Sequence, residues 1–228
     1  MVGERVPSKP AFGRARVNTR GLLWSVTGAA YLVFALWYTN LSGPLTKTEV
    51  DHYVALLEQE GAAPERIAQV RAFLEADTGR QFVMVNLIDM ADAPPQLPGA
   101  PPNATAEDLL GVYMAHMYRE LFKRACHPVF VGDAVFAPLD VVGVERPEAW
   151  PRTALMRYRS RRDMIEIATN PAFRERHAFK IAAFDKTIAY PVETVLYTSD
   201  ARMLLFVLLL AIVAAADLAI YGRRQQTK

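Results

Sequence analysis

The sequence contains few side chains whose types and spacing could carry out chemistry. His116 and Glu120 stand four residues apart in a helical pattern, which would place them on one face as metal ligands or as an acid–base pair. An exposed helix pair is the simpler interpretation. The remaining histidines, His52, His127 and His177, are far apart in sequence, and His177 falls on an apolar stripe typical of a hydrogen-bonded core histidine. We therefore predict no catalytic constellation and no metal site.

Five arginines gather around one predicted strand in an otherwise acidic region. They are Arg152, Arg157, Arg159, Arg161 and Arg162. Guanidinium groups bind carboxylates and phosphates through paired hydrogen bonds, so the cluster could hold an anion or an acidic partner. Because charge runs are usually exposed, a solvated strand end neutralised by neighbouring acids is the simpler interpretation. Arg157, Arg159 and Arg161 are the candidate partner-binding residues of this cluster.

Two long apolar runs must position everything else. Residues 22–38 and 203–220 are each close to the ~20 apolar residues that a helix needs to cross a bilayer. The first run does not end in a small-residue cleavage site, so we predict an uncleaved anchor rather than a signal peptide. Transmembrane helices are assigned to residues 21–39 and 202–221.

Each predicted span carries small residues at intervals of four. They are Gly21, Ser25 and Ala29 in the first span, and Ala211, Ala215 and Ala219 in the second. Small residues on one helical stripe let backbones approach closely in lipid, so the spans should pack on each other or on another subunit. Asp217 is the only charge in the second run. It either functions within the membrane or extends to the interface near Arg223 and Arg224.

Charge is distributed unevenly along the chain. The tails at 1–20 and 222–228 are basic, whereas residues 41–201 hold 17 Lys and Arg against 22 Asp and Glu. Short basic flanks stay in the cytoplasm. We therefore predict a bacterial inner-membrane protein with both termini cytoplasmic and residues 40–201 periplasmic. The acidic domain argues against nucleic-acid binding. The single Cys126 allows no internal disulfide and is expected to be a buried, inert thiol.

Between the spans, the patterns predict a helical extension at 40–79 and an α+β domain at 80–200. Helices are expected at 45–60 and 64–77, then from Thr105, from near Arg161 and from Asn170, and strands at 82–88, 128–137, around 141–145, 153–159 and 188–197. The apolar strand at 82–88 should be central and buried on both faces. Pro191 places the last strand at an edge, because proline cannot donate to a ladder. The order β-α-β-β-α-β, with the uncertain short strand omitted, is the ferredoxin-like pattern.

Several motifs of this domain resemble one family. They are the strand Met84 to Leu87, the turn from Glu145 through Glu148 to Trp150, the strand end at 157–160, and the segment from Asn170 to Phe173. They are similar to domain-of-unknown-function family 1330, and the resemblance covers about half of the chain. It implies a ferredoxin-like domain of the dimeric α/β-barrel class, for which a homodimer is possible, and it implies no particular reaction.

In that class, helices cover one face of the sheet and a second protomer covers the other. Strand alternation predicts that one face here is lined by Met84, Asn86, Ile88, Ala154, Met156 and Tyr158. Because this chain adds helices and two spans to the family pattern, we predict that the helices at 45–77, or another subunit, cover the open face in place of an identical protomer.

The missing catalytic motifs and the small-residue stripes favour a non-catalytic accessory or scaffolding subunit of a larger inner-membrane complex, respiratory or photosynthetic. Its partners would be other integral membrane subunits and the bilayer, without a cofactor. The alternative is a membrane-tethered enzyme or small-ligand binder that uses the cleft between sheet and helices, as several dimeric α/β barrels do. Tyr113, His116, Tyr158 and His177 are its first candidates. An open polar cleft would favour this alternative, whereas a cleft filled by apolar side chains would favour the subunit.

Overall fold

The structure is a computed structural model that describes residues 18–145 and 148–222, except for the side chains of residues 174 and 175. Apart from residues 18–20 and 222, the two predicted basic tails lie outside the described residues, as do residues 146 and 147 of the predicted acidic turn. The chain forms two compact units. Of the described residues, one unit comprises 18–33 and 203–222, and the other comprises those between 34 and 202.

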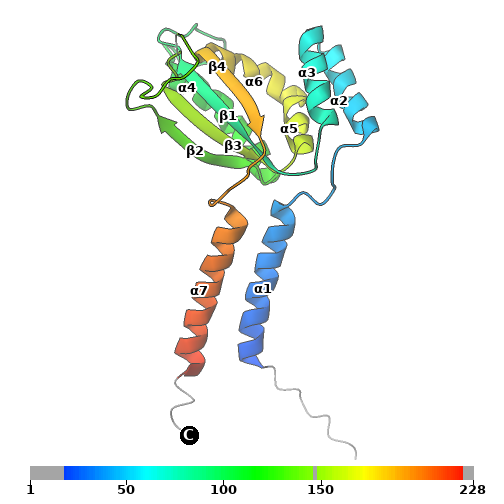
Figure 1. The fold of residues 1–228 in the computed structure, drawn as a ribbon, viewed down its shortest axis with the longest axis vertical. Helices are drawn as coiled ribbons and strands as arrows, with labels where there is room; N and C mark the ends of the chain where they lie inside the picture. The colour runs from blue at the N-terminus through cyan, green and yellow to red at the C-terminus, as the bar shows by residue number, and fades with distance from the viewer. Residues whose placement is uncertain (1–17, 146–147, 223–228) are drawn as a thin grey trace, which may run out of the picture. The chain divides into compact units, whose positions relative to one another are not determined.

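Two apolar helices, α1 (Thr19–Tyr38) and α7 (Ala201–Tyr221), correspond to the predicted spans (Figure 1). Both are long and apolar enough to cross a membrane. In the first unit they contact each other through large side chains, including the rings of Tyr31 and Phe206, whose centroids are 5.4 Å apart. Val213 of α7 is buried.

The small-residue stripes do not form this contact. All six of their members are exposed: Gly21, Ser25, Ala29, Ala211, Ala215 and Ala219. Of the two alternatives for the stripes, packing of one span on the other is not seen here, because bulky side chains such as Tyr31 and Phe206 form the contact between the helices. That the stripes pack on another subunit stays a prediction.

Asp217 pairs with Arg20 of the other helix. The Nε and Nη2 atoms of Arg20 donate to the two carboxylate oxygens of Asp217, each at 2.7 Å, and Asp217 is buried. One turn away, the Tyr221 hydroxyl donates to Thr19 Oγ1 at 2.9 Å. A bidentate Arg–Asp pair satisfies an acid that would otherwise be costly in an apolar helix. Among the described residues, the partner of Asp217 is thus on α1, whereas Arg223 and Arg224 lie outside the described residues.

The second unit is built on a four-stranded antiparallel sheet. Its strands are β1 (Phe82–Met90), β2 (His127–Asp133), β3 (Arg152–Tyr158) and β4 (Phe184–Val192), in the spatial order β2-β3-β1-β4. As predicted, β1 is central and the proline-containing β4 lies at an edge. The strand predicted around 141–145 is wrong. Beyond β2 the Ala134 N–H bonds to Pro151 O, and residues 135–145 form a loop whose apolar residues have no neighbouring strand to pair with.

Five helices complete the unit: α2 (Lys47–Gln59), α3 (Pro64–Glu75), α4 (Ala106–Lys123), α5 (Arg161–Ala168) and α6 (Pro171–Ala182). Thr46 and Thr105 form capping boxes with the acid three residues on, and Ser160 and Asn170 cap α5 and α6, so side-chain oxygens satisfy the first N–H groups of each helix.

The helices α4 and α6 lie against the same face of the sheet, and α2 and α3 lie beside α5 (Figure 1). Leu57 and Leu74 of the α2–α3 pair share a buried cluster with Ile165 of α5. The ring of Phe73 meets that of Phe82 at 5.7 Å. The helices at 45–77 therefore extend the helical layer, and the expectation that they would cover the open face of the sheet is wrong.

The opposite side, which we call the outer sheet face, is apolar. Alternation places Val85, Leu87, Leu155, Phe130, Ile188 and Tyr190 on it. Phe130, Ile188 and Tyr190 are exposed, and no described residue covers them. The prediction that β1 is buried on both faces holds only at Phe82, Val83 and Ile88. Its middle is half-buried, because one face borders a cavity and the other is uncovered.

Arg157 joins four segments of the second unit. Its side chain is fully buried and donates to Ala125 O at 2.5 Å, to Tyr38 O at 3.0 Å and to Gln81 Oε1 at 2.7 Å. The guanidinium lies 3.6 Å from the centroid of the Tyr38 ring, and the Tyr38 hydroxyl meets His127 Nε2 at 2.7 Å. Burial lowers the pKa of Arg157, but an arginine stays charged at neutral pH.

We expect the two charges at Arg20 and Asp217 to be coupled. Arg20→Asp and Asp217→Arg should each lower the thermal stability of the helix pair in lipid nanodiscs, because each leaves like charges facing each other. The double exchange should recover most of the loss, because it restores an opposite-charge pair. Tyr221→Phe, which removes only a neutral hydrogen bond, is the control. Purely additive effects would show that the pair does not hold the helices together.

Arg157→Met should destabilise the second unit by about 3 kcal/mol, because it removes the guanidinium that donates to the buried carbonyl oxygens of Ala125 and Tyr38. Arg157→Lys should not restore stability, because an ammonium cannot reproduce the planar fork. Urea unfolding monitored by near-UV circular dichroism measures both. Arg119→Met, at an exposed position of α4, is the matched control and should change stability by less than about 0.5 kcal/mol. Equal effects of Arg157→Met and Arg119→Met would refute this account of the junction.

Candidate functional site

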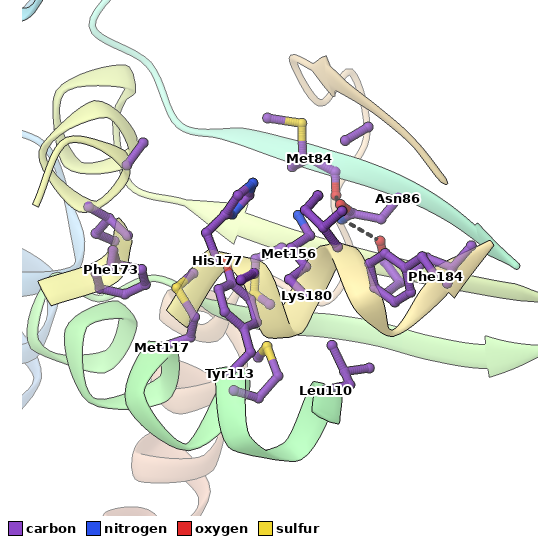
Figure 2. Close-up of a pocket in the computed structure, with 18 of the residues that line it drawn as sticks. Met84, Asn86, Leu110, Tyr113, Met117, Met156, Phe173, His177, Lys180 and Phe184 are labelled. Atoms are coloured by element: carbon purple, nitrogen blue, oxygen red, sulfur yellow. Dashed lines mark hydrogen bonds between the residues drawn. The ribbon is translucent and has the colours of Figure 1, made fainter. Parts of the chain in front are cut away.

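A cavity of about 1300 Å³ lies between the sheet and the helices α4 and α6 (Figure 2). Its origin is a divided core. Toward one end, Tyr113, Met117 and Phe173 belong to a buried cluster, and at the other end Leu109 and Ala183 belong to a second one. Between these clusters the side chains of the two helices do not fill the space above the sheet. Protein interiors are normally packed to crystal-like density, so a space of this size is a candidate ligand site.

Most of the cavity wall is apolar. Strands β1 and β3 contribute Met84, Ile88, Ala154 and Met156, and α4 contributes Leu110 among others. Five of the chain's eight methionines line it: Met84, Met114, Met117, Met156 and Met164. Unbranched thioether side chains adapt their shape to what they contact, and they are enriched on surfaces that accept varied ligands.

A few polar groups face this apolar space. The Asn86 amide nitrogen donates to Ala154 O at 3.0 Å and to Met84 O at 3.2 Å, which fixes the side chain against the sheet. Tyr113 and Tyr158 also line the cavity. Burial raises the pKa of Tyr113 to about 12 and raises that of Tyr158 as well. Both phenols are therefore neutral at physiological pH and can serve as hydrogen-bond donors.

One side of the cavity carries positive charge. Lys180 and His177 extend from α6 toward the strand that bears Met84 and Asn86 (Figure 2), and Arg66 of α3 lines the same space. The Lys180 ammonium lies 5.9 Å from the centroid of the Tyr113 ring. Burial, and secondarily Arg66, lower the pKa of Lys180; burial followed by Lys180 and Arg66 lowers that of His177. These shifts have the sign expected for a cation held among apolar groups and like charges.

Three of the four residues proposed for a ligand-binding cleft meet in this cavity. They are Tyr113, Tyr158 and His177. His177 is exposed rather than buried in the core, so the core interpretation of its apolar stripe is wrong. His116 does not line the cavity. Its ring packs 5.2 Å from that of Phe173, and its Nε2 has no hydrogen-bond partner among the described residues. The expected pairing with Glu120 does not form, because Glu120 binds Arg124 at 2.5 Å.

Sequence reasoning missed Asn86, Lys180 and Arg66 as members of the site. Asn86 was assigned to the correct sheet face, but nothing in a single sequence shows that the face borders a void. A lysine three residues after His177 on the same helix face was the available signal for Lys180. Arg66 comes from the added helix pair, whose position could not be predicted. Within the described residues, no three His, Cys, Asp or Glu side chains cluster as metal ligands would.

The candidate arginines bind their own chain. Arg157 is enclosed as described above. Arg159 forms a bidentate pair with Asp163 and donates to Trp37 O at 3.1 Å. Arg161 donates to Phe73 O and lies 3.4 Å from Glu193. The nearby Arg152 and Arg162 pair with acids in the same way. Internal acceptors thus neutralise the cluster; a role for Arg159 or Arg161 in partner binding stays a prediction.

Cys126 is fully buried, and burial raises the pKa of its thiol to about 12. The Arg159 N–H donates to its sulfur at 3.4 Å. The expectation of a buried thiol is confirmed, and a thiol with so high a pKa reacts slowly at neutral pH.

Comparisons with known proteins add little to this picture. No family model matches the chain, and no curated protein matches it. Among solved structures, a protein of unknown function from Rhodopseudomonas palustris is similar, with a TM-score of 0.47 and 19% identity over 59% of this chain and 95% of that one. The methylated form of the same protein gives a TM-score of 0.47 and 19% identity over 60% and 95% of the two chains.

Proposed function

We propose that this protein is a membrane-tethered binding domain for a small, largely apolar ligand. The observation that carries the proposal is the cavity of about 1300 Å³ between sheet and helices. Ligand sites in proteins are concave, mostly apolar and equipped with a few convergent polar groups. This cavity has apolar walls with Asn86, Tyr113 and Tyr158 placed among them, which is neither the open polar cleft nor the filled cleft anticipated from the sequence.

The fold and the anchoring of this domain belong to the same proposal. The strand order β2-β3-β1-β4 and the element order support a ferredoxin-like assignment, and the motifs described above support a relationship to family 1330. Two apolar helices and their basic flanks support a bacterial inner-membrane location, with residues 40–201 in the periplasm. A periplasmic site of this kind could bind apolar molecules that leave or enter the lipid.

Protection of a cysteine placed in the cavity tests the proposal at the site itself. Ala154→Cys puts a thiol on the cavity wall, and Cys126 needs no removal because it is buried and slow to react. The full chain in nanodiscs is alkylated with and without decanol. At ten times the half-protecting concentration, the rate at the new thiol should fall about tenfold, because only the empty fraction reacts.

Ile188→Cys, on the outer sheet face, is the matched control. Decanol should leave its alkylation rate unchanged, since that position does not line the cavity. Equal protection at both positions would mean non-specific coating, and no protection at Ala154→Cys up to the solubility of decanol would refute the binding function.

A second candidate is the accessory or scaffolding subunit of a larger membrane complex, and one observation favours it. The outer sheet face exposes Phe130, Ile188 and Tyr190 side by side with half-buried Val85, Leu87 and Leu155. Contiguous apolar surface of this kind usually marks an interaction site. The partner we propose is another integral membrane subunit, which would also meet the exposed small-residue stripes of α1 and α7.

Purification in mild detergent from the native membrane tests this second role. The subunit proposal expects other membrane proteins to co-purify in fixed ratio, and Ile188→Lys to release them by placing a charge on the outer sheet face. The exposed Arg119→Glu should leave them bound. Isolation of a lone chain, or of a homodimer joined through this face, would count against the subunit role and leave the ligand proposal intact.

A further inference from the structure

We infer that the ligand of the cavity carries an anionic group, and that Lys180 binds this group with Arg66 and His177 beside it. The inference rests on the proposed binding function and specifies the chemical class of the ligand. The molecule would be an amphiphile, with an apolar body against the methionine-rich wall and a carboxylate or phosphate at Lys180.

Lys180 is a cation that lacks a counter-ion in the described part of the chain. It lines the cavity and is half-buried, and among the described residues it has no hydrogen bond and no ion pair. Its ammonium lies 5.9 Å from the centroid of the Tyr113 ring, and a cation–π interaction at this distance is a weak substitute for water or a counter-ion. A cation in apolar surroundings is destabilised unless an anion joins it. An anionic ligand group would supply that counter-ion.

The acidic side chains that line the cavity do not pair with Lys180. Glu107 is bound to Arg152 at 2.5 Å, and Glu60 has an interaction of its own. Asp185 lines the cavity but is no ion-pair partner of Lys180. The charged group that acts on Lys180 is Arg66, which is also positive. The local balance at Lys180 is therefore positive, although the domain as a whole is acidic.

Lys180 differs from the buried and half-buried arginines of the domain, which have partners in the chain. Arg152, Arg157 and Arg159 direct their donors to acceptors of their own chain, at distances of 2.5 to 3.1 Å. The guanidinium groups of these residues stabilise the fold, and their hydrogen bonds within the chain occupy them. Lys180 alone among these cations combines a place in the cavity wall with no protein partner in the described residues.

Arg66, His177 and Lys180 differ in their access to solvent. Arg66 and His177 are exposed, whereas Lys180 is half-buried. The positive Arg66 and the imidazole of His177, which its lowered pKa leaves neutral at neutral pH, therefore stand where solvent reaches the cavity. The Lys180 ammonium lies further in. Such an arrangement attracts an anionic head group toward the site and then pairs it with Lys180, while the apolar body enters the methionine-lined space.

The test compares decanoate with decanol in the Ala154→Cys protection assay on the full chain in nanodiscs of neutral lipid. The two probes share a chain length and differ in head-group charge. The half-protecting concentration of each probe is measured in the parent chain and in the chain with Lys180→Gln. The decanoate-to-decanol ratio of these concentrations is then compared between the two chains, because differences in partitioning into lipid cancel in that comparison. Decanoate should lose about tenfold in affinity relative to decanol on Lys180→Gln, the size of one charge-assisted hydrogen bond.

Control variants keep the inference falsifiable. Lys123→Gln changes an exposed lysine on α4 that does not line the cavity and should leave the ratio unchanged. Arg66→Gln should reduce the decanoate preference by a smaller factor, and it serves if Lys180→Gln does not fold, as judged by its melting temperature. An unchanged ratio in Lys180→Gln would overturn the anion inference. Decanol protection would survive in that case, so failure of the inference is distinguishable from failure of the binding function.

A second comparison distinguishes a lipid head group from a free acid as the source of the anionic group. Nanodiscs that contain phosphatidylglycerol and no decanoate are compared with discs of phosphatidylcholine alone. Lys180-dependent protection of Ala154→Cys in the anionic discs alone would identify a lipid head group, whereas protection by added decanoate alone would identify a free acid. Protection in neither case would overturn the inference.

Discussion

The enclosed guanidinium of Arg157 is the interaction on which the domain depends. It joins the end of α1 at Tyr38, the start of β1 at Gln81, the turn before β2 at Ala125, and its own strand β3. A buried cation without a carboxylate within ion-pair distance in the described residues is stable only because carbonyl oxygens and the Tyr38 ring surround it. Removing any of these partners leaves charge or acceptors unsatisfied, so the junction forms as a whole.

This rigid junction has a consequence for the rest of the domain. Fully buried side chains are concentrated at one end of the sheet, where Phe82, Cys126 and Ser160 lie near Arg157. The middle of the sheet is left bordered by a cavity and by the uncovered outer sheet face. Proteins commonly concede packing at functional sites and recover stability elsewhere. Lys180, which has no hydrogen bond or ion pair among the described residues, lines this unfilled cavity.

Much of the fold could be predicted from local patterns. The capping boxes at Thr46 and Thr105, the start of α6 at Asn170 and the edge position of β4 follow from hydrogen-bonding rules that act within a few residues. The strand around 141–145 was mispredicted because an apolar run indicates a strand only where a neighbour can pair with it. The position of α2 and α3 depends on their contact with α5, which no local pattern encodes.

The candidate site was predicted only in part. Of the candidates, Tyr113, Tyr158 and His177 line the cavity and His116 does not, whereas Lys180 was overlooked. A cavity depends on the spacing between the helices and the sheet, and amino-acid composition does not show that spacing. In the same way, the single-sequence view of Asp217 identified an unusual residue but not its partner, because Arg20 lies at the other end of the chain.

The proposed function requires that the cavity hold an acidic amphiphile in the native protein. The most direct measurement is mass spectrometry of small molecules extracted from the full chain purified in nanodiscs, compared with the same chain carrying the cavity-filling Ala154→Phe. We expect a carboxylate- or phosphate-bearing apolar molecule, close to one per chain, in the parent protein and its loss in the variant. An identical complement of molecules in both proteins would contradict it.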